Sequence, residues 1–496
     1  MERILHSSAY HCSTSSPLDI VYLLPSPYHL LRRALSLLNS MGSFTSPHKT
    51  IAIDITRSPS EFDVDDETGF MPRQPLPRLP SKYVIWELAL SDASEALVLA
   101  TDDSDDAMSK RHRGEAWRSN IKSWPVLDVS DLQSEKLLLQ RAHHVLAYLA
   151  HYFAHSAPSE GASPIHVPES LAIPLVEVSR LLGIAPILTY ADTVLWNWEL
   201  INPAQQLSIE NMRVLDVFSG TDDERFFYSV SYTVELRGVE ALQIIDEYNR
   251  LPNLSTYIAT SKVARDLDRL TGIIEDISDI IQSVQPLCDP HVFYWEIRPW
   301  FCGSDASGPD APGWIYDGVQ DCHLLDLSGP SGGQSSLMHA LDVFLSIDFS
   351  QREKRRPAPS EQNKGGDGGF MERMRRYMPG EHRDYLQHLA NTPRSVRELA
   401  QNTPSLREPY DAAVMALKKL RDLHMRIACR YIVNMSRTKR GIPAGCPVSA
   451  MMDRMDRQNS QNSGQTAVRG TGGNEVSRLL KATRDATRRA MLKDNI

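Results

Sequence analysis

The sequence is poor in cysteine and has no excess of basic residues. Six cysteines are spread over 496 residues, and no two of them form a Cys-x-x-Cys pair. This pattern fits neither a disulfide framework nor a tetrathiolate zinc site, and it favours a reducing compartment. Lys and Arg number 53 against 62 Asp and Glu, a net charge of −9. We therefore expect no nucleic-acid partner, because binding nucleic acid normally requires a basic surface.

Long hydrophobic runs are also missing. The longest apolar stretch near the start, residues 17–35, is interrupted by Pro25 and Pro27 and carries Arg32 and Arg33. It is unsuited to span a bilayer, so we expect no membrane anchor and a cytoplasmic monomer. Residues 1–58 are rich in Ser, Pro and His and show no sustained period. They predict a poorly ordered extension, with mitochondrial targeting as the alternative.

Apolar residues instead repeat with helical spacing over several long segments. Between residues 257 and 284 they recur every three or four positions without a break, and residues 132–155 show the same period. This periodicity is typical of amphipathic helices. Capping-box spacings indicate two further helix starts, at Ser395 with Glu398 and at Ser405 with Glu408.

Strand signals are short and do not alternate with helices. They fall at residues 51–55, 84–86 and 292–297. We expect loops at residues 303–318, 352–369 and 434–473, the last two mobile. The predicted fold class is mainly α, with a small N-terminal domain of helices and minor β structure over residues 59–218 and a large all-helical domain over residues 219–496.

A histidine stripe accompanies the apolar face of residues 132–155. It consists of His144, His151 and His155, with Tyr148 between them. Imidazoles four residues apart on a helix can share a metal ion. Tyr152 stands where a zinc protease motif has its glutamate, which favours a solvated histidine face or one that contacts another domain.

Residues 329–333 match the pattern Gly-x-Ser-x-Gly, with Ser331 at its centre. In hydrolases this serine is an acyl nucleophile between a strand and a helix, for which residues 324–327 and 334–347 are the candidates. Such hydrolases have an alternating α/β sheet, which this chain lacks. The other interpretation is a glycine-rich turn that lets the backbone approach a flat ligand or an anion closely.

Residues 405–432 form an apolar helical stripe that a single histidine, His424, interrupts. A histidine satisfied within the core is one explanation. Axial ligation of a haem iron is the functional alternative, because an apolar wall leaves dry space on the open side of the metal. Arg421 lies one turn earlier and would pair with a haem propionate or with Asp342.

Arg298 ends the densest aromatic cluster of the chain, which runs from Phe293 to Trp295. Such a cluster would hold an aromatic amino acid by ring stacking, with a bidentate guanidinium contact to its carboxylate. A core strand that ends in a surface ion pair is the alternative.

Several segments together resemble the indoleamine 2,3-dioxygenase family of haem enzymes. The resemblance runs from about residue 63 to the C-terminus and rests on the order and spacing of the segments. They are residues 188–192 with 197–198, 227–235, 293–298, 331–342, 374–379, 420–424 and 470–473.

The resemblance implies that the two domains hold haem b between them and that O₂ is the co-substrate. His424 matches the proximal iron ligand, and Asp342, Arg421 and Ser331 match residues that bind the cofactor. Ser231 and Arg298 match catalytic positions. The implied substrate-binding residues are Tyr190, Val194, Phe227, Phe293, Arg298, Ser331, Gly332 and Thr471.

The implied reaction inserts O₂ across the indole C2–C3 bond of L-tryptophan or a related indoleamine. It yields N-formylkynurenine, the first step of the kynurenine pathway to NAD, and it needs an electron donor that keeps the iron ferrous. The matched distal residues include no histidine or acid to donate a proton. The alternative is a haem-binding or sensing member with low turnover, since the pocket departs from the family pattern at Thr193, Tyr228, Tyr294 and Pro330.

Overall fold

The computed structural model describes residues 57–102, 104–158, 163–304, 313–349, 369–438, 471 and 476–492. The expected extension and the two expected mobile loops lie almost wholly outside these residues, as does the strand signal at residues 51–55.

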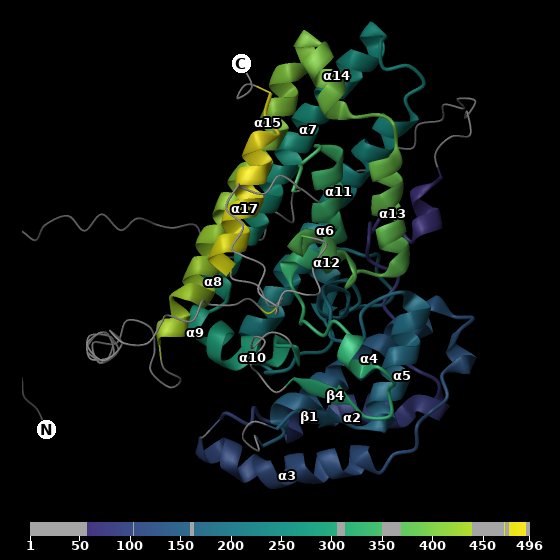
Figure 1. Cartoon of the computed structure of the whole chain (residues 1–496), viewed down its shortest axis with the longest axis vertical. Coiled ribbons are helices and arrows are strands. Elements are labelled where there is room, and N and C mark those ends of the chain that lie inside the picture. Colours follow the sequence, from purple (N-terminus) through teal and green to yellow (C-terminus); the bar gives the residue numbers. More distant parts are fainter. Residues whose placement is uncertain are drawn as a thin grey trace, which may run out of the picture.

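The mainly helical fold is confirmed. Long helices form a bundle that occupies the upper part of the view in Figure 1. Helix α15 packs along α7 and α17, α7 packs on α6, and α11 contacts both α6 and α13. The bundle contains α6 (Asp222–Arg250), α7 (Tyr257–Gln282), α11 (Ser336–Phe344), α13 (Gly380–Asn391), α14 (Val396–Asn402), α15 (Pro404–Ala428) and α17 (Val476–Arg489).

Four further helices and two small sheets accompany the bundle, and these helices lie in the lower part of the view in Figure 1. The helices are α2 (Val84–Ala96), α3 (Asp105–Lys122), α4 (Lys136–Ser156) and α5 (Glu169–Leu182). The sheets are a parallel pair, β1 (Ile165–Val167) with β4 (Trp314–Tyr316), and an antiparallel pair, β2 (Trp198–Leu200) with β3 (Met212–Val214). Two predictions are wrong at strand β4. It lies within residues 303–318, which were expected to form a loop, and within residues 219–496, which were expected to be all helical. The domain division at residues 218 and 219 stays a prediction.

Short helical turns connect these elements. Three of them are π-helical: η4 (Ala191–Leu195), η6 (Phe293–Ile297) and η11 (Cys429–Val433). The α-helical turns are α8 (Val284–Leu287), α9 (Pro290–Val292), α10 (Arg298–Phe301) and α12 (Phe370–Arg375). The 3₁₀ turns are η1 (Pro59–Phe62), η2 (Ser81–Tyr83), η3 (Ser130–Leu132), η5 (Ile209–Asn211), η8 (Cys322–Leu324), η9 (Gly332–Gln334) and η12 (Met435–Arg437).

The helical periods locate their helices well. Residues 132–155 and 257–284 are confirmed as α4 and α7. Ser395 caps α14, because its Oγ accepts the Glu398 backbone N–H at 3.2 Å. The second capping box is wrong, since α15 starts at Pro404 and Ser405 lies inside it. Proline is favoured in the first turn of a helix, and it sets this start.

Two predicted strands are helical instead. Residues 84–86 begin α2, whose inner face packs on α4, so tertiary burial overrides the strand preference of the β-branched side chains. Residues 292–297 lie in α9 and η6. Here Asp289 accepts the backbone N–H of His291 at 2.7 Å, and Pro290 occupies the first helical position. Both features favour a helix start.

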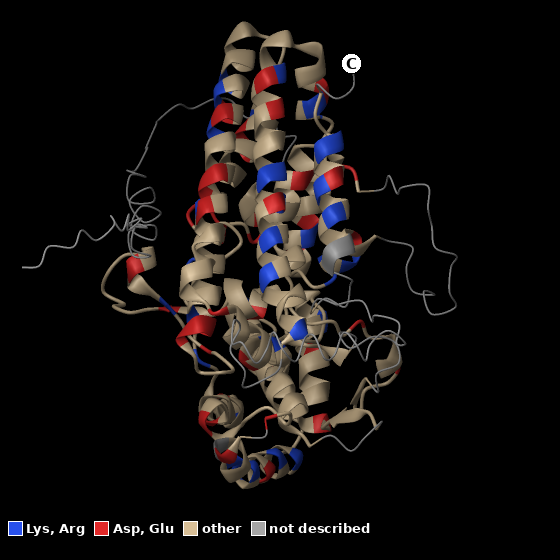
Figure 2. Cartoon of the chain, turned by 90° about the vertical axis from the view of Figure 1, so that its left-hand side faces the viewer, with Lys and Arg blue, Asp and Glu red and all other residues tan. Residues whose placement is uncertain are grey.

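Charged residues of both signs cover the long helices. Figure 2 shows bands of Lys and Arg interspersed with bands of Asp and Glu along them. Within the described part of the chain, no helix is both long and apolar enough to cross a membrane.

Two helical glycines provide a matched test of the packing. A Cβ on Gly238 in α6 would lie 2.1 Å from Cδ2 of Leu337, whereas a Cβ on Gly272 in α7 would meet no described atom within 4 Å. We expect Gly238→Ala to lower the free energy of unfolding by about 1–3 kcal/mol, because buried Leu337 must shift. Gly272→Ala should raise it by about 0.5–1 kcal/mol, since alanine restricts the unfolded chain. Thermal unfolding measures both changes, and equal midpoints would contradict the packing.

Candidate functional site

Three aromatic rings connect α6, η6 and η11, which directly follows α15. The rings of Phe227 and Phe293 have centroids 4.9 Å apart, and Phe293 makes an edge contact with Tyr431 at 5.7 Å. Ser231 lies one turn after Phe227 on α6 and donates its hydroxyl to the Phe227 carbonyl at 3.1 Å. Phe227 and Phe293, far apart in the sequence, therefore meet next to η11, which directly follows the helix that carries His424.

The turn that carries Arg298 is fixed from behind by two histidines of α4. His151 Nδ1 lies 2.7 Å from the Trp300 carbonyl, and His155 Nε2 lies 2.7 Å from the Cys302 carbonyl. Both ring nitrogens donate, because the carbonyl oxygens only accept. The Arg298 guanidinium itself lies 5.3 Å from the centroid of the Tyr294 ring. The histidine stripe thus contacts another part of the chain, as one of the two interpretations expected.

The remaining histidine of that stripe also has a structural partner. His144 Nε2 lies 2.9 Å from Asp216 Oδ2, which also accepts from Arg141 at 3.1 Å. Although burial opposes it, these two donors hold the pKa of Asp216 below its usual range. Within the described ranges no three His, Cys, Asp or Glu residues gather to hold a metal ion.

The glycine-rich turn lies directly against the Arg298 turn. A Cβ on Gly329 would be 1.7 Å from the Phe301 carbonyl oxygen, so only glycine permits this approach. Thr471 closes the turn from the other side: its hydroxyl donates to the Pro330 carbonyl at 2.6 Å, and its carbonyl accepts from the Gly329 N–H at 3.1 Å. Ser331, Gly332 and Thr471 are thereby brought to one place.

Ser331 does not have the surroundings of an acyl nucleophile. Its hydroxyl accepts the Gly333 N–H at 3.2 Å and caps η9. Residues 322–324 form a 3₁₀ turn, and no strand leads directly into the serine, since the preceding strand, β4, ends at Tyr316. The candidate strand at 324–327 is therefore wrong, whereas α11 confirms the helix expected within 334–347. The hydrolase interpretation has no support in this geometry.

His424 differs from the other members of its stripe. The flanking residues Leu420 and Ile427 are buried, whereas the side chain of His424 is exposed, contrary to the expectation of a buried stripe. Burial by surrounding protein atoms and the charge of Arg421 nevertheless lower its pKa. None of the described residues forms a hydrogen bond to this histidine.

Arg421, one turn earlier, faces the bundle interior. Its Nη2 donates to Asp342 Oδ1 at 2.5 Å, and its Nη1 bonds to the hydroxyl of Thr487 on α17. The predicted pairing of Arg421 with Asp342 is therefore present. Burial raises the pKa of Asp342 even with this cation beside it. The second oxygen of Asp342 is buried and has no partner among the described residues.

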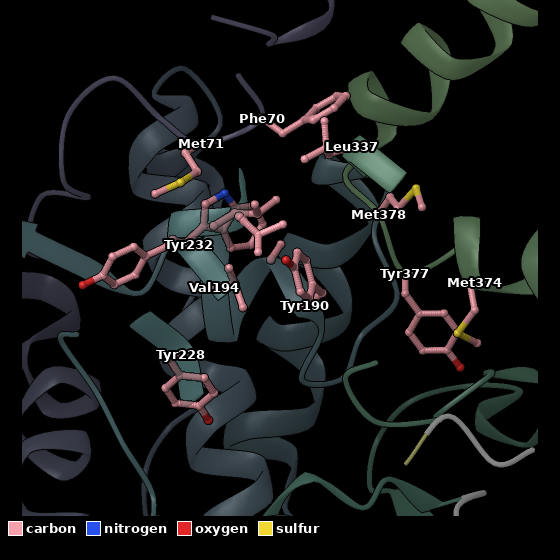
Figure 3. Close-up of a cluster of buried hydrophobic side chains, with 14 of the residues drawn as sticks. Phe70, Met71, Tyr190, Val194, Tyr228, Tyr232, Leu337, Met374, Tyr377 and Met378 are labelled. Atoms are coloured by element: carbon pink, nitrogen blue, oxygen red, sulfur yellow. The ribbon is translucent and has the colours of Figure 1, made fainter. Parts of the chain in front are cut away.

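Tyr190 and Val194 belong to the buried cluster drawn in Figure 3. Val194 lies on the π-helical turn η4, and Tyr190 is the residue that precedes this turn. The Tyr190 hydroxyl donates to Glu235 Oε1 at 2.9 Å, and the Ser335 hydroxyl donates to the same oxygen at 2.8 Å. Glu235 is 1% exposed. The distal residues matched in the sequence include no acid, yet Glu235 lies a single hydrogen bond behind Tyr190. The sequence held one sign of this acid: Glu235 follows Ser231 by four residues, which places both on the same face of α6.

The fold and this site define a class of protein. It is a mainly helical protein in which an aromatic cluster, followed in the chain by an arginine, lies next to the end of the helix that carries an accessible, neutral histidine. This combination suits an enzyme that binds a flat cofactor through one axial ligand.

Comparison with known proteins identifies the family. Residues 58–490 match the family profile "Indoleamine 2,3-dioxygenase". The chain is 29% identical over 454 residues to indoleamine 2,3-dioxygenase 1 of Rattus norvegicus, covering 90% of this chain and 99% of that protein. It is 28% identical over 455 residues to the indoleamine 2,3-dioxygenase of Saccharomyces cerevisiae, covering 86% and 92%. The chain belongs to the indoleamine 2,3-dioxygenase family of haem-dependent oxidoreductases.

A third relative has a different printed substrate. It is the 6-hydroxytryptophan 2,3-dioxygenase of Fusarium equiseti, 28% identical over 444 residues and covering 87% of this chain and 97% of that protein. The family therefore includes more than one indole substrate.

Because the carboxyl group of Glu235 is buried, we expect the free energy of unfolding to depend on pH. Burial raises its pKa from 4.5 to about 7, against the two hydroxyl donors. Between these values the folded chain holds a proton that the unfolded chain has released, so stability falls as pH rises through this window. The loss reaches about 3 kcal/mol at 1.36 kcal/mol per pKa unit. Glu235→Gln lacks this titration, so its melting temperature should rise relative to wild type between pH 4.5 and 7.5. A difference independent of pH would contradict the raised pKa.

Proposed function

We propose that this chain binds haem b through His424 and inserts both atoms of O₂ across the indole C2–C3 bond of L-tryptophan. The product is N-formylkynurenine, which begins the kynurenine route to NAD. The observation that carries the proposal is the contact of Phe227 with Phe293, and of Phe293 with Tyr431 just after the helix of His424, in a chain of this family.

The residues around His424 fit a haem. A metal ligand must be a neutral imidazole, and the lowered pKa of His424 keeps the ring neutral at physiological pH. Its accessible position within an apolar stripe leaves room for a flat group. Arg421 and Asp342 place a buried charge pair one turn away, where they would act on the cofactor side. When bound, ferrous haem with one histidine ligand supplies an iron centre that activates O₂.

The other residues would orient the substrate. Arg298 would hold the carboxylate in its planar fork, with Tyr294 against the guanidinium. Phe227 and Phe293 would pack on the indole ring, and Val194 would complete the apolar wall. Holding the indole in one orientation lowers the entropic barrier to the reaction.

Polar groups around this wall are few. We assign the Ser231 hydroxyl a tuning contact, since it already donates to its own helix. Ser331, Gly332 and Thr471 would form the rim, and Ser331 would also contact the cofactor. A Cβ on Gly332 would meet no described atom within 4 Å, so this backbone faces open space that a ligand can enter.

The choice of indole substrate is a second part of the proposal. L-Tryptophan is the first candidate, and a hydroxylated tryptophan is the second because one relative is named for it. The departures at Tyr228, Tyr294 and Pro330 bear on this choice, because these residues contact Phe227, Arg298 and Thr471. The alternative function is haem binding or sensing with slow turnover of substrate. We also propose an external electron donor and a cytoplasmic monomer.

His424→Ala tests the cofactor assignment. We expect the variant to lose the haem absorption that reconstituted wild type shows in the Soret region, because the axial ligand is removed. His323→Ala, at an exposed histidine on η8, is the matched control and should retain haem. Equal Soret absorption in the two variants would exclude His424 as the ligand.

Arg298→Lys tests the carboxylate contact, since it keeps the charge but loses the fork. We expect KM for L-tryptophan to rise about thirty-fold, equivalent to ~2 kcal/mol, whereas turnover of tryptamine, which has no carboxylate, should change little. Steady-state assays of N-formylkynurenine formation, with 6-hydroxytryptophan as a third substrate, provide the comparison. Parallel losses on L-tryptophan and tryptamine would overturn the role given to Arg298.

A further inference from the structure

Three parts of the proposed substrate wall meet at one buried carboxylate. Glu235 lies one turn after Ser231 on α6 and accepts from Tyr190, which precedes η4, and from Ser335, which caps α11. Tyr190 is 9% exposed and Ser335 is 4% exposed, so all three groups lie inside the protein. The carboxylate therefore connects elements that are 45 and 100 residues away in the sequence.

The residue next to Ser335 holds Tyr190 at a second point. The side-chain oxygen of Gln334 accepts the Tyr190 backbone N–H at 2.8 Å, and its Nε2 donates to the Gly329 carbonyl at 2.9 Å. Tyr190 is thus fixed at its backbone and at its hydroxyl by two consecutive residues. The same two residues anchor the turn that contains Ser331.

The hydrogen-bonding capacity of this network is well used. Ser335 Oγ accepts the Met338 N–H at 3.3 Å as the cap of α11 and donates its single proton to Glu235. The Tyr190 hydroxyl has one proton and also gives it to Glu235. An apolar side chain at position 235 would therefore leave two buried hydroxyl donors without an acceptor.

Glu235 is costly to bury. Within the described residues no Lys, Arg or His forms an ion pair with it, so burial raises its pKa and only hydroxyl donors compensate. An apolar residue of similar size would fill this place without desolvating a carboxyl group. A buried acid with a perturbed pKa that lies next to a candidate site is typical of a functional group.

We propose that Glu235 is a positioning residue for the substrate: it holds the Tyr190 ring and the turn at residues 329–335 in the geometry that binds the indole. This inference rests on the proposed function, because it deepens the description of the same site. Without the carboxylate, the substrate would have to order Tyr190 on binding, and affinity would fall by the free energy of that ordering.

The experiment is a double-mutant cycle on the haem-loaded chain. Glu235→Leu, Tyr190→Phe and the double variant are titrated with L-tryptophan, and Kd is read from the substrate-induced change in the haem spectrum. We expect each single change to raise Kd about ten-fold, the effect of one buried hydrogen bond, and the double variant to be no weaker than the weaker single variant. Asp246→Leu, three turns further along α6, is the matched control and should leave Kd unchanged.

A conservative variant separates positioning from charge. Glu235→Gln keeps a carbonyl oxygen that accepts from both hydroxyls, so we expect it to recover most of the affinity lost in Glu235→Leu. If Glu235→Leu does not fold, Tyr190→Phe and Ser335→Ala break the same network from the other side and should each raise Kd. The midpoint of thermal unfolding, measured for every variant, reports any purely structural loss.

The outcomes distinguish the two proposals. Independent, additive losses of affinity, or lowered melting temperatures with unchanged Kd, would overturn the positioning role of Glu235. A wild-type chain that binds L-tryptophan but forms no product would overturn the proposed reaction alone, because the cycle is read from binding. A chain whose haem spectrum does not respond to any indole would overturn both.

Discussion

The packing of α15 against α7 and α17 fixes the direction of the side chains on which the site depends. Its buried stripe includes Leu417, Ile427 and, two turns beyond His424, Tyr431 of η11. Rotating the helix would expose these residues, and burying each large apolar side chain contributes about 1.5–3 kcal/mol. The apolar stripe therefore holds His424 toward the accessible space while Arg421 points into the bundle. No hydrogen bond from a described residue is needed to orient the histidine.

Buried polar groups add a second kind of constraint, which apolar packing cannot supply. Apolar contacts have little directionality, whereas the pair of Arg421 with Asp342 and the carboxylate of Glu235 each require particular donors at particular distances. Both groups are expensive to desolvate, and replacing such groups by apolar residues is often neutral or stabilising. The proposed function therefore explains their presence better than stability does.

The sequence was sufficient for the parts of the molecule that periodicity governs. The repeats of α4 and α7 and the stripe around His424 follow from local spacing, so they were predictable. Residues 84–86 were not, because their strand preference is overridden by packing against α4. Glu235 shows the other limit: its position on α6 was visible, but its partners lie 45 and 100 residues away, and only the folded chain brings them together. The assignment of His424 as a ligand came from resemblance, since spacing alone favoured a core histidine.

The hydrogen bonds of Pro330 and Thr193 explain why this fold accepts two residues that depart from the pattern expected for the family. Pro330 has no backbone N–H, but the contact with Thr471 uses its carbonyl oxygen, so a proline at this position keeps the turn closed. Thr193 donates its hydroxyl to the Thr189 carbonyl within its own helical turn, at 3.2 Å. Its polar atom is satisfied there and imposes no demand on a ligand. Pro330 and Thr193 therefore preserve the local backbone. Under the proposed function, a change in substrate preference would have to arise from side chains such as Tyr294, which contacts Arg298.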